Sequence, residues 1–437
     1  MAKKIALVSL GCQKNLIDSE IMLGILVEND FEITNNKDEA DLVVINTCTF
    51  ISDAREETTQ VVEEFIHWKK SDNSRKLILA GCHVQREKKA IFSLWPEIDG
   101  IIGVNDIPNL TKLLFDLYKK NKTQISFINQ TFCSIEYKFP RVISTLSAST
   151  YIKIAEGCDN FCSYCIIPQL RGNYRSRQAK HILQEVAELA AEGIRELCLI
   201  AQDIGGYGKD LKKGNLVSLL KDICKVNGIE WVRLLYLYPD NITDELIELI
   251  KNEPKICNYV DIPMQHSSDR ILSLMNRRST NKQLLALINK LREQIPGIVI
   301  RSTFIVGFPG ETEEEFLDLL AFVKEVKLDK VGFFKYSREA GTKAAAFSGQ
   351  VSEEDKEERI QALLNEQTRV LEEKNKELLG RQFTVIMDNA VSGRYYGQSP
   401  EVDGVILVQK SIGTLDVFQK VKIVDVADIN LKGEFVA

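Results

Sequence analysis

The chain has 437 residues, of which 44% are hydrophobic and 27% charged, and its formal net charge is −6. This composition is ordinary for a globular protein, and the length suggests roughly three domains. The net negative charge gives no overall positive potential that would attract a nucleic acid. No apolar stretch approaches the ~20 residues that span a bilayer, and the N-terminus has no signal-peptide pattern. We therefore expect a cytoplasmic protein with no membrane partner, whose ten cysteines stay reduced and favour metal binding or catalysis over disulfides.

The first third of the chain alternates short β-rich apolar runs with helical patterns. Strands are predicted at residues 4–11, 41–47 and 75–81, and helices at 16–29, 51–68 and 83–95. Alternation of this kind predicts an open parallel α/β sheet with helices on its faces.

Three cysteines, Cys12, Cys48 and Cys82, each follow one of these strands. Ligands of an open α/β sheet bind at the carboxyl ends of its strands, so we expect the three thiols to converge on one site. Three protein ligands would leave one iron of a four-iron cluster open. The alternative is that they are small buried residues, as free cysteines often are. His83 is a candidate fourth ligand, although a histidine at a helix start is more often an ordinary polar residue.

The middle of the chain contains six further strand patterns separated by helical ones. These strands are predicted at residues 151–157, 196–203, 231–238, 259–265, 298–307 and 330–337. Six β/α units are two fewer than a complete (β/α)8 barrel contains, so we expect a partial (β/α)6 barrel with an open side.

A CxxxCxxC run formed by Cys158, Cys162 and Cys165 lies in the loop after the first of these strands. Three thiolates at this spacing can hold a 4Fe–4S cluster whose fourth iron is free to bind a small molecule. Polar residues gather at the same strand ends: Gln202, Asp203, Tyr236, Tyr238, Gln265, His266 and, within the fifth strand, Arg301. Each has an alternative reading as a solvated or satisfied polar residue, but together they predict a polar pocket that faces the cluster.

Two loop segments near this predicted pocket contain candidate ligand-binding residues. Residues 307–316 form a turn in which Gly307 could let a ligand approach the backbone, and Thr312 with Glu315 predicts a capping box. The basic run at 171–177 could clamp a carboxylate or phosphate, or could be a solvated loop. The unpaired cysteines are predicted to be structural: Cys133, Cys198, Cys224 and Cys257.

The last part of the chain begins with a charged amphipathic helix predicted over 353–380, with Gly380 as its C-cap. Short strand patterns at 383–391, 395–400, 404–410, 417–426 and 434–436 then predict a small β-barrel of the OB type. From residue 381 on, six basic residues stand against seven acidic ones, which disfavours RNA and favours a protein partner.

The CxxxCxxC after the first strand of a partial barrel resembles the radical S-adenosylmethionine (SAM) superfamily, with Tyr164 at the aromatic position before the last cysteine. The N-terminal cysteine trio and a C-terminal module similar to a TRAM domain narrow the resemblance to the methylthiotransferases. The runs SLGCQKNLIDSE, NTCTFISDAREE, DIPMQHSSDRIL and YGQSPEVDG resemble the RimO-type branch, which modifies an aspartate of small-subunit ribosomal protein twelve. One departure is Gln13, where that branch has proline and the transfer-RNA branch has glutamine.

The resemblance implies a domain order and two cofactors. It implies an N-terminal methylthiotransferase domain over 1–122, a linker over 123–143, a radical SAM core over 144–375 and a TRAM-like substrate-recognition domain over 376–437. Two 4Fe–4S clusters are implied, one on Cys12, Cys48 and Cys82 and one on Cys158, Cys162 and Cys165. SAM would be both methyl donor and radical source. The expected SAM or substrate contacts are Tyr164, Gln202, Asp203, Arg301 and Gly307.

The implied reaction is methylthiolation of the β-carbon of the target aspartate. Radical chemistry is implied because ordinary acid–base chemistry offers no route to a carbon–sulfur bond at that carbon. The implied partners are the ribosomal protein, within the ribosome or its small subunit, and an electron donor. Two alternatives remain open: a methylthiotransferase that acts on an adenosine of transfer RNA, and a non-catalytic metal protein with zinc in both trios and an RNA-binding barrel. Structural zinc sites normally use four ligands, whereas each trio supplies three.

Overall fold

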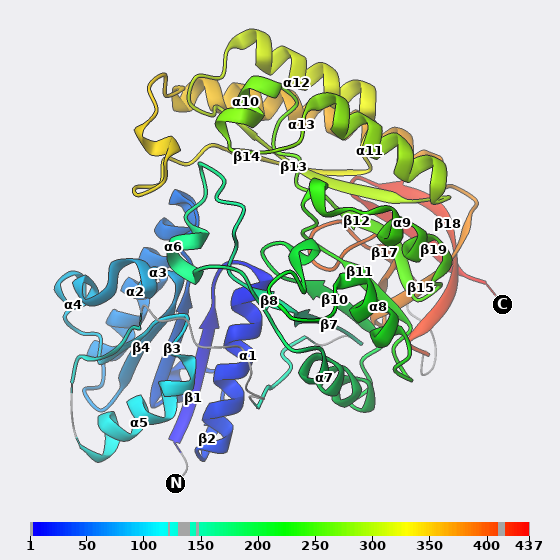
Figure 1. Cartoon of the computed structure of the whole chain (residues 1–437). Helices are drawn as coiled ribbons and strands as arrows, with labels where there is room; N and C mark the ends of the chain where they lie inside the picture. The colour runs from blue at the N-terminus through cyan, green and yellow to red at the C-terminus, as the bar shows by residue number, and fades with distance from the viewer. Residues whose placement is uncertain (1–2, 121–122, 130–139, 146–147, 410–415, 437) are drawn as a thin grey trace.

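The computed structural model describes residues 3–120, 123–129, 140–145, 148–409 and 416–436 (Figure 1). Two parallel sheets are followed by a closed β-barrel, as the strand patterns predict. Cys133 and residues 130–139 of the predicted linker lie outside the described residues. Within the described residues, no helix is both long and apolar enough to cross a membrane.

The N-terminal sheet has six parallel strands in the order β2-β1-β3-β4-β5-β6. They are β1 Lys3–Ser9, β2 Phe31–Ile33, β3 Leu42–Thr47, β4 Lys76–Gly81, β5 Gly100–Ile102 and β6 Ile125–Phe127. The helices are α1 Gln13–Glu28, α2 Ser52–Lys70, α3 Cys82–Glu87, α4 Ile91–Leu94 and α5 Leu110–Lys119. Strands β2, β5 and β6 were not predicted, because three residues are too few to establish a period.

One predicted helix of this domain is wrong in its extent. The pattern at 83–95 divides into α3 and α4, with a 3-10 turn at Lys88–Ala90 between them. Lys88 has a φ of 54°, which a continuous right-handed helix cannot accommodate.

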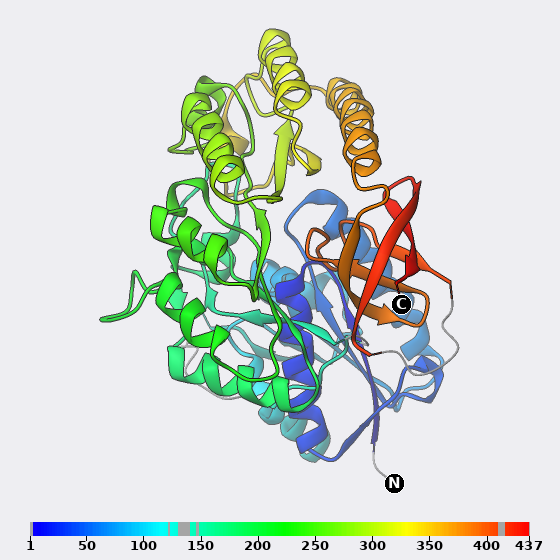
Figure 2. The ribbon, with the colours of Figure 1, turned by 90° about the vertical axis from the view of Figure 1, so that its right-hand side faces the viewer.

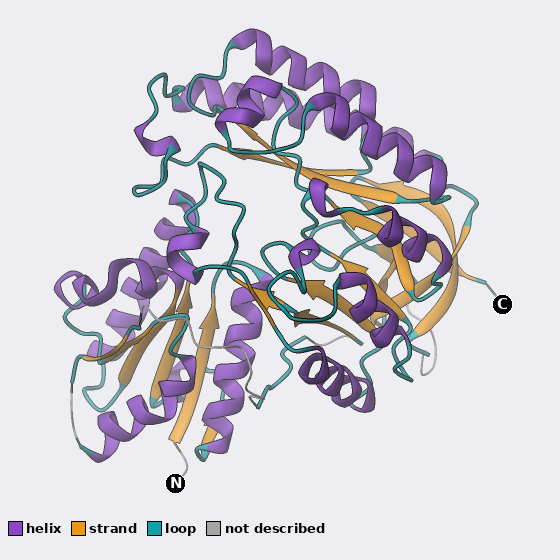
Figure 3. Ribbon diagram, viewed as in Figure 1, coloured by secondary structure: helices purple, strands orange, loops and turns teal. Residues whose placement is uncertain are grey.

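The central sheet has six parallel strands in the order β14-β13-β12-β11-β10-β7 and is not closed, so the predicted partial barrel is confirmed. They are β7 Ser149–Lys153, β10 Glu196–Ile200, β11 Trp231–Leu234, β12 Ile256–Asp261, β13 Val299–Val306 and β14 Lys330–Lys335. The helices are α7 Ala179–Ala191, α8 Leu216–Cys224, α9 Asp244–Asn252, α10 Asp269–Leu274, α11 Asn281–Gln294 and α12 Glu313–Val326. They cover the outer face of the sheet (Figure 3), and Thr312 and Glu315 form the predicted capping box at the start of α12.

The N-terminal domain contacts the central domain near both free edges of the open sheet. At one edge, α1 packs beside β7, and Ile17 joins Tyr151 in a shared apolar cluster. At the other edge, Arg55 of α2 and Arg86 of α3 both pair with Glu339, which follows β14 and has a side chain only 2% exposed. The N-terminal domain therefore links the two edges that the six strands leave unpaired.

The linking helix α13 spans Glu353–Lys376 and ends four residues before the predicted cap at Gly380. The amides of Leu378 and Leu379 close tight turns onto the carbonyls of Asn375 and Lys376, and the amide of Gly380 then donates to the carbonyl of Ile423 in the barrel. Figure 2 shows the barrel directly below the end of α13. Its strands are β15 Gln382–Asn389, β16 Ser392–Tyr395, β17 Ile406–Val408, β18 Phe418–Ala427 and β19 Asn430–Phe435, closed in the order β15-β16-β17-β19-β18.

The strand predicted at 395–400 is wrong, because only Tyr395 of that segment belongs to a strand. The rest forms a loop directed at the central domain, in which the Tyr396 carbonyl accepts a hydrogen bond from Arg233 at 2.6 Å. Contacts with the central domain thus replace the ladder of hydrogen bonds that a strand would need.

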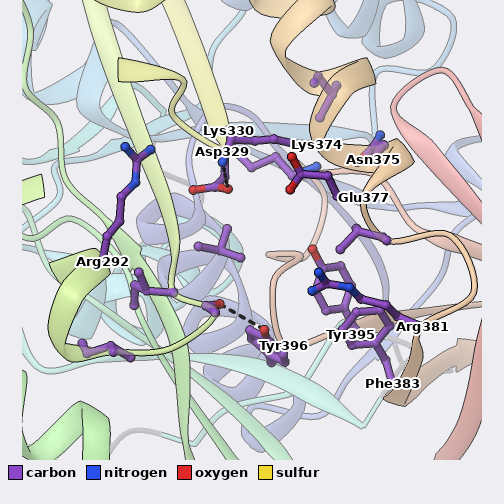
Figure 4. A pocket seen from close by; sticks show the side chains of 16 residues that line it. Arg292, Asp329, Lys330, Lys374, Asn375, Glu377, Arg381, Phe383, Tyr395 and Tyr396 are labelled. Atoms are coloured by element: carbon purple, nitrogen blue, oxygen red, sulfur yellow. Dashed lines mark hydrogen bonds and ion pairs between the residues drawn. The ribbon is translucent and has the colours of Figure 1, made fainter. Parts of the chain in front are cut away.

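The barrel packs against the amino ends of the central strands. Trp231, the first residue of β11, lies 5.1 Å from Phe418 between ring centroids. Glu196, the first residue of β10, pairs with Arg394 at 2.8 Å. A cavity of about 260 Å³ at this junction, bounded also by α13, contains the Lys374–Asp329 ion pair (Figure 4). This cavity is at the opposite end of the strands from the cysteines.

Candidate functional site

The N-terminal trio lies at the carboxyl ends of three adjacent strands. Cys12 follows β1 and precedes α1, Cys48 follows β3, and Cys82 is the first residue of α3 after β4. Cys12 is exposed, whereas Cys48 and Cys82 are buried. Burial raises the pKa of the Cys82 thiol to about 11 against the opposing charge of Arg171, and Cys12 and Cys48 are close enough to raise it further. The structure therefore brings the three predicted ligands together.

The backbone beside Cys48 is shaped around its sulfur. Gly11 has a φ of +88°, and a Cβ placed on it would lie 2.7 Å from Cys48 Sγ. Such a position accepts glycine but no larger residue without a shift of the thiol. The donor set and this close packing fit a thiolate-bound cluster.

Changing Gly11 to alanine is expected to displace Cys48 and to remove iron from the N-terminal trio, while SAM cleavage at the barrel trio continues. Iron analysis and product analysis after anaerobic reconstitution measure both effects. Gly193→Ala is a matched control, because Gly193 also has a positive φ, +100°, but nothing lies within 4 Å of its added Cβ. Equal iron loss in both variants would contradict the specific role of Gly11.

The second trio lies in the loop between β8 (Ala155–Glu156) and α6 (Ile167–Arg171), just after β7. The loop is held from several sides: Asn160 donates to Asp203 at 3.0 Å, and the Ser163 amide donates to the Met275 carbonyl at 3.0 Å. Burial raises the pKa of Cys158 to about 11, and the charge of Cys162 adds to that effect. Three thiols close enough to influence one another lie in a loop fixed by the strand ends.

Each trio has one buried arginine beside a cysteine sulfur. Arg171 Nη2 lies 3.4 Å from Cys82 Sγ, and Arg277 Nη1 lies 3.9 Å from Cys162 Sγ. Hydrogen bonds to cluster sulfurs and local charge are among the factors that set the reduction potential of an iron–sulfur cluster. Arg171 was predicted to belong to a clamp or to a solvated loop, and Arg277 was not predicted at all because its partners are distant in sequence.

Arg171 also belongs to a network of four buried charges between the two domains, which we call the interdomain ion network: Asp18, Lys153, Glu156 and Arg171. Arg171 pairs with Glu156 at 2.9 Å and with Asp18 at 3.1 Å. Lys153 pairs with the same two carboxylates at 2.9 and 2.5 Å. The two positive and two negative charges of the network cancel. Its ion pairs hold α1 against the start of the second cysteine loop.

The predicted SAM-contacting residues differ in how many of their hydrogen-bonding groups are already used within the protein. Gln202 donates to Glu156 at 2.6 Å, but its buried Oε1 has no partner among the described residues. Asp203 accepts hydrogen bonds from the side chains of Asn160 and Asn241, at 3.0 and 2.7 Å. Gln202 therefore retains an unused acceptor, whereas Asp203 holds the cysteine loop.

The other predicted contacts lie on neighbouring elements. Arg301 pairs with Asp261 at 3.2 Å and with Asp403 of the barrel at 3.4 Å. Gly307 has a φ of +68°, and its amide is bonded to the Glu311 carboxylate. Tyr164 packs against the apolar cluster that includes Phe308.

His266 and the basic run are engaged within the protein. His266 is fully buried, and its Nδ1 accepts from the Ser268 amide at 2.9 Å, as expected for a satisfied core residue. Arg177 pairs with Glu185 at 2.6 Å. Cys198, Cys224 and Cys257 are buried, in agreement with their predicted structural role.

The arrangement of the cysteines indicates whether the two trios can bind iron–sulfur clusters or single zinc ions. Among the described residues, no three His, Cys, Asp or Glu side chains converge as the ligands of a single ion would. A four-iron cluster spreads its thiolates over separate irons, so its ligands do not share one coordination sphere. Each trio supplies three thiols, one fewer than the four ligands of structural zinc and the number that leaves one iron of a four-iron cluster open.

Family models match the three parts of the chain. They are described as uncharacterized protein family UPF0004 at residues 4–103, radical SAM superfamily at 152–323 and TRAM domain at 379–436. Together with the open sheet and its cysteine loop, they define the class of the protein: a radical SAM enzyme with added N- and C-terminal domains.

The ribosomal protein uS12 methylthiotransferase RimO of Clostridium perfringens strain SM101 is 44% identical over 441 residues, 99% of this chain and 98% of that protein. The RimO of Geobacter sulfurreducens is 42% identical over 443 residues, 100% and 99% of the two chains. This chain belongs to the RimO family of methylthiotransferases.

Among solved structures, the radical SAM methyltransferase TsrM from Kitasatospora setae matches with a TM-score of 0.56 and 15% identity, over 77% of this chain and 72% of that one. The cobalamin-dependent radical SAM enzyme OxsB matches with a TM-score of 0.53 and 13% identity, over 85% and 56%. At these identities the similarity concerns the fold alone.

Proposed function

We propose that this chain methylthiolates the β-carbon of an aspartate in ribosomal protein uS12 by radical SAM chemistry. The supporting observation is the pair of cysteine trios, carried by two domains and joined through Arg171, which contacts Cys82 at 3.4 Å and lies at the end of the helix that follows the second trio. The RimO relatives align with nearly the whole chain, which supports uS12 as the substrate.

Radical SAM membership implies SAM and a 4Fe–4S cluster, and we propose that Cys158, Cys162 and Cys165 hold this cluster. We assign a second cluster to Cys12, Cys48 and Cys82. When bound, SAM and the clusters supply a carbon radical and the sulfur. The residues around them hold the two sites and exclude water. Tyr164, Gln202, Asp203, Arg301 and Gly307 remain our candidate contacts for SAM or substrate, and Asp203 also holds the cysteine loop through Asn160.

The domain limits 1–122, 144–375 and 376–437, with a linker over 123–143, remain our proposal, although β6, the edge strand of the N-terminal sheet, lies within the proposed linker. We further propose that the barrel helps to recognise uS12 in the ribosome or its small subunit, in the cytoplasm, and that a separate protein donates electrons. The near-neutral charge of the barrel, six basic against seven acidic residues from residue 381, supports a protein substrate.

The test compares two substrates in parallel with the reconstituted full-length enzyme. We expect the methylthio mass on uS12 when small subunits are supplied, and no modification of transfer RNA. Modification of an adenosine in transfer RNA alone would establish the alternative activity, with which Gln13 agrees. Zinc binding without SAM cleavage would contradict both enzyme assignments.

A further inference from the structure

Lys14 lies between the two cysteine sites. It is the second residue of α1 and follows Cys12 by two positions. Its side chain crosses to the central domain, where Nζ donates to the Ala201 carbonyl at 3.2 Å and lies 3.6 Å from the centre of the Tyr236 ring. Ala201 and Tyr236 follow β10 and β11, so the ammonium group faces the strand ends beside Gln202.

Lys14 has no carboxylate partner. Lys14 is only 8% exposed, yet it forms no ion pair with any other residue that the structure describes. The nearby interdomain ion network is balanced internally, two charges against two. The negative charges that reach Lys14 come first from the Cys12 thiol and then from Glu156 and Asp261, and both carboxylates are already paired, with Arg171 and with Arg301. A buried cation with no carboxylate of its own is costly, which makes this position one that an anionic ligand would complete.

We infer that Lys14 binds the carboxylate of the substrate aspartate and thereby fixes its β-carbon between the two cysteine sites. This inference rests on the proposed function. An ammonium group has three donors, and Ala201 uses one, so two remain for the two carboxylate oxygens. The β-carbon is bonded directly to the carboxyl carbon, so holding the carboxylate also holds the carbon to be modified. A site built this way discriminates against an uncharged side chain.

The carboxylate could also come from SAM itself, and the test separates the two sources. Full-length enzyme and its Lys14→Met variant are compared on uS12 with the target aspartate and on uS12 with asparagine at that position. We expect Lys14→Met to weaken binding of the aspartate form on the order of 100-fold. It should leave binding of the asparagine form nearly unchanged, which is a coupling that a double-mutant cycle measures. SAM cleavage without uS12 should be retained.

Three results would overturn the inference. Loss of SAM binding in Lys14→Met would assign the lysine to the SAM carboxylate. A changed spectrum of the N-terminal cluster with an unchanged preference for aspartate over asparagine would make Lys14 a cluster counter-ion. Equal weakening of both uS12 forms would indicate a structural role. Failure of the wild-type enzyme to modify uS12 is a separate outcome, and it would refute the proposed function first.

Lys330 offers a matched control. It is buried to a similar degree, 9% exposed, and its Nζ also donates to a backbone carbonyl, that of Asp403, at 3.2 Å. It is the first residue of β14 and therefore lies at the amino end of the sheet, away from the cysteines. We expect Lys330→Met to leave the ratio of the two uS12 affinities unchanged.

Discussion

Replacing Cys158 with alanine is expected to abolish SAM cleavage and to lower the iron content of the reconstituted enzyme from about eight to about four atoms per chain. The reason is that Cys158 belongs to the trio at the end of the radical SAM sheet, while the N-terminal trio lies on a different domain. Iron analysis and chromatography of SAM products provide the measurement.

The counterpart, Cys48→Ala, should also halve the iron content but should leave SAM cleavage and stop formation of methylthio-uS12. Cys198→Ala serves as the control, because Cys198 is a fully buried core cysteine that belongs to neither trio. Loss of SAM cleavage in Cys48→Ala would contradict the assignment of SAM cleavage to the barrel trio alone.

Replacing Arg171 with methionine should destabilise the protein by about 3–5 kcal/mol, because two buried carboxylates would lose a shared partner. Asp18 and Glu156 lie on different domains, so the loss should also loosen the contact between those domains. Chemical unfolding followed by fluorescence measures the loss, and a separate early transition would report the loosened domain.

Arg270→Met provides the comparison for Arg171. Arg270 also pairs with a carboxylate, that of Glu315, but its side chain is 52% exposed. Exposed ion pairs contribute about 0–1 kcal/mol, so this variant should unfold almost as the wild type does. A loss of equal size in the two variants would show that the interdomain ion network has no special role.

The cysteine sites could be predicted from sequence because they depend on short-range patterns. Each N-terminal cysteine follows a recognisable apolar run, and the rule for strand ends then brings Cys12, Cys48 and Cys82 together. The roles of Lys14 and Arg277 could not be found in this way. Their partners come from elements more than a hundred residues away, so no local period or spacing records the contact.

Local patterns also failed where tertiary contacts decide the backbone. In the loop after Tyr395 only Tyr396 favours a strand, whereas Gly397 to Pro400 favour a turn, and the Tyr396 carbonyl bonds to Arg233 of the central sheet. The helix predicted up to Gly380 ends at Lys376: the amides of Leu378 and Leu379 close tight turns onto Asn375 and Lys376, and the amide of Gly380 bonds to Ile423 of the barrel. In both cases the competing partner is distant in sequence.

The position of the barrel strands sets a minimum length for any substrate that contacts both these strands and the cysteines. The barrel lies against the amino ends of the central strands, and the cysteine loop follows a carboxyl end. Strand β13 has eight residues, which corresponds to about 26 Å between those ends. A free amino acid cannot span that distance, whereas an extended segment of about eight residues or a larger protein surface can.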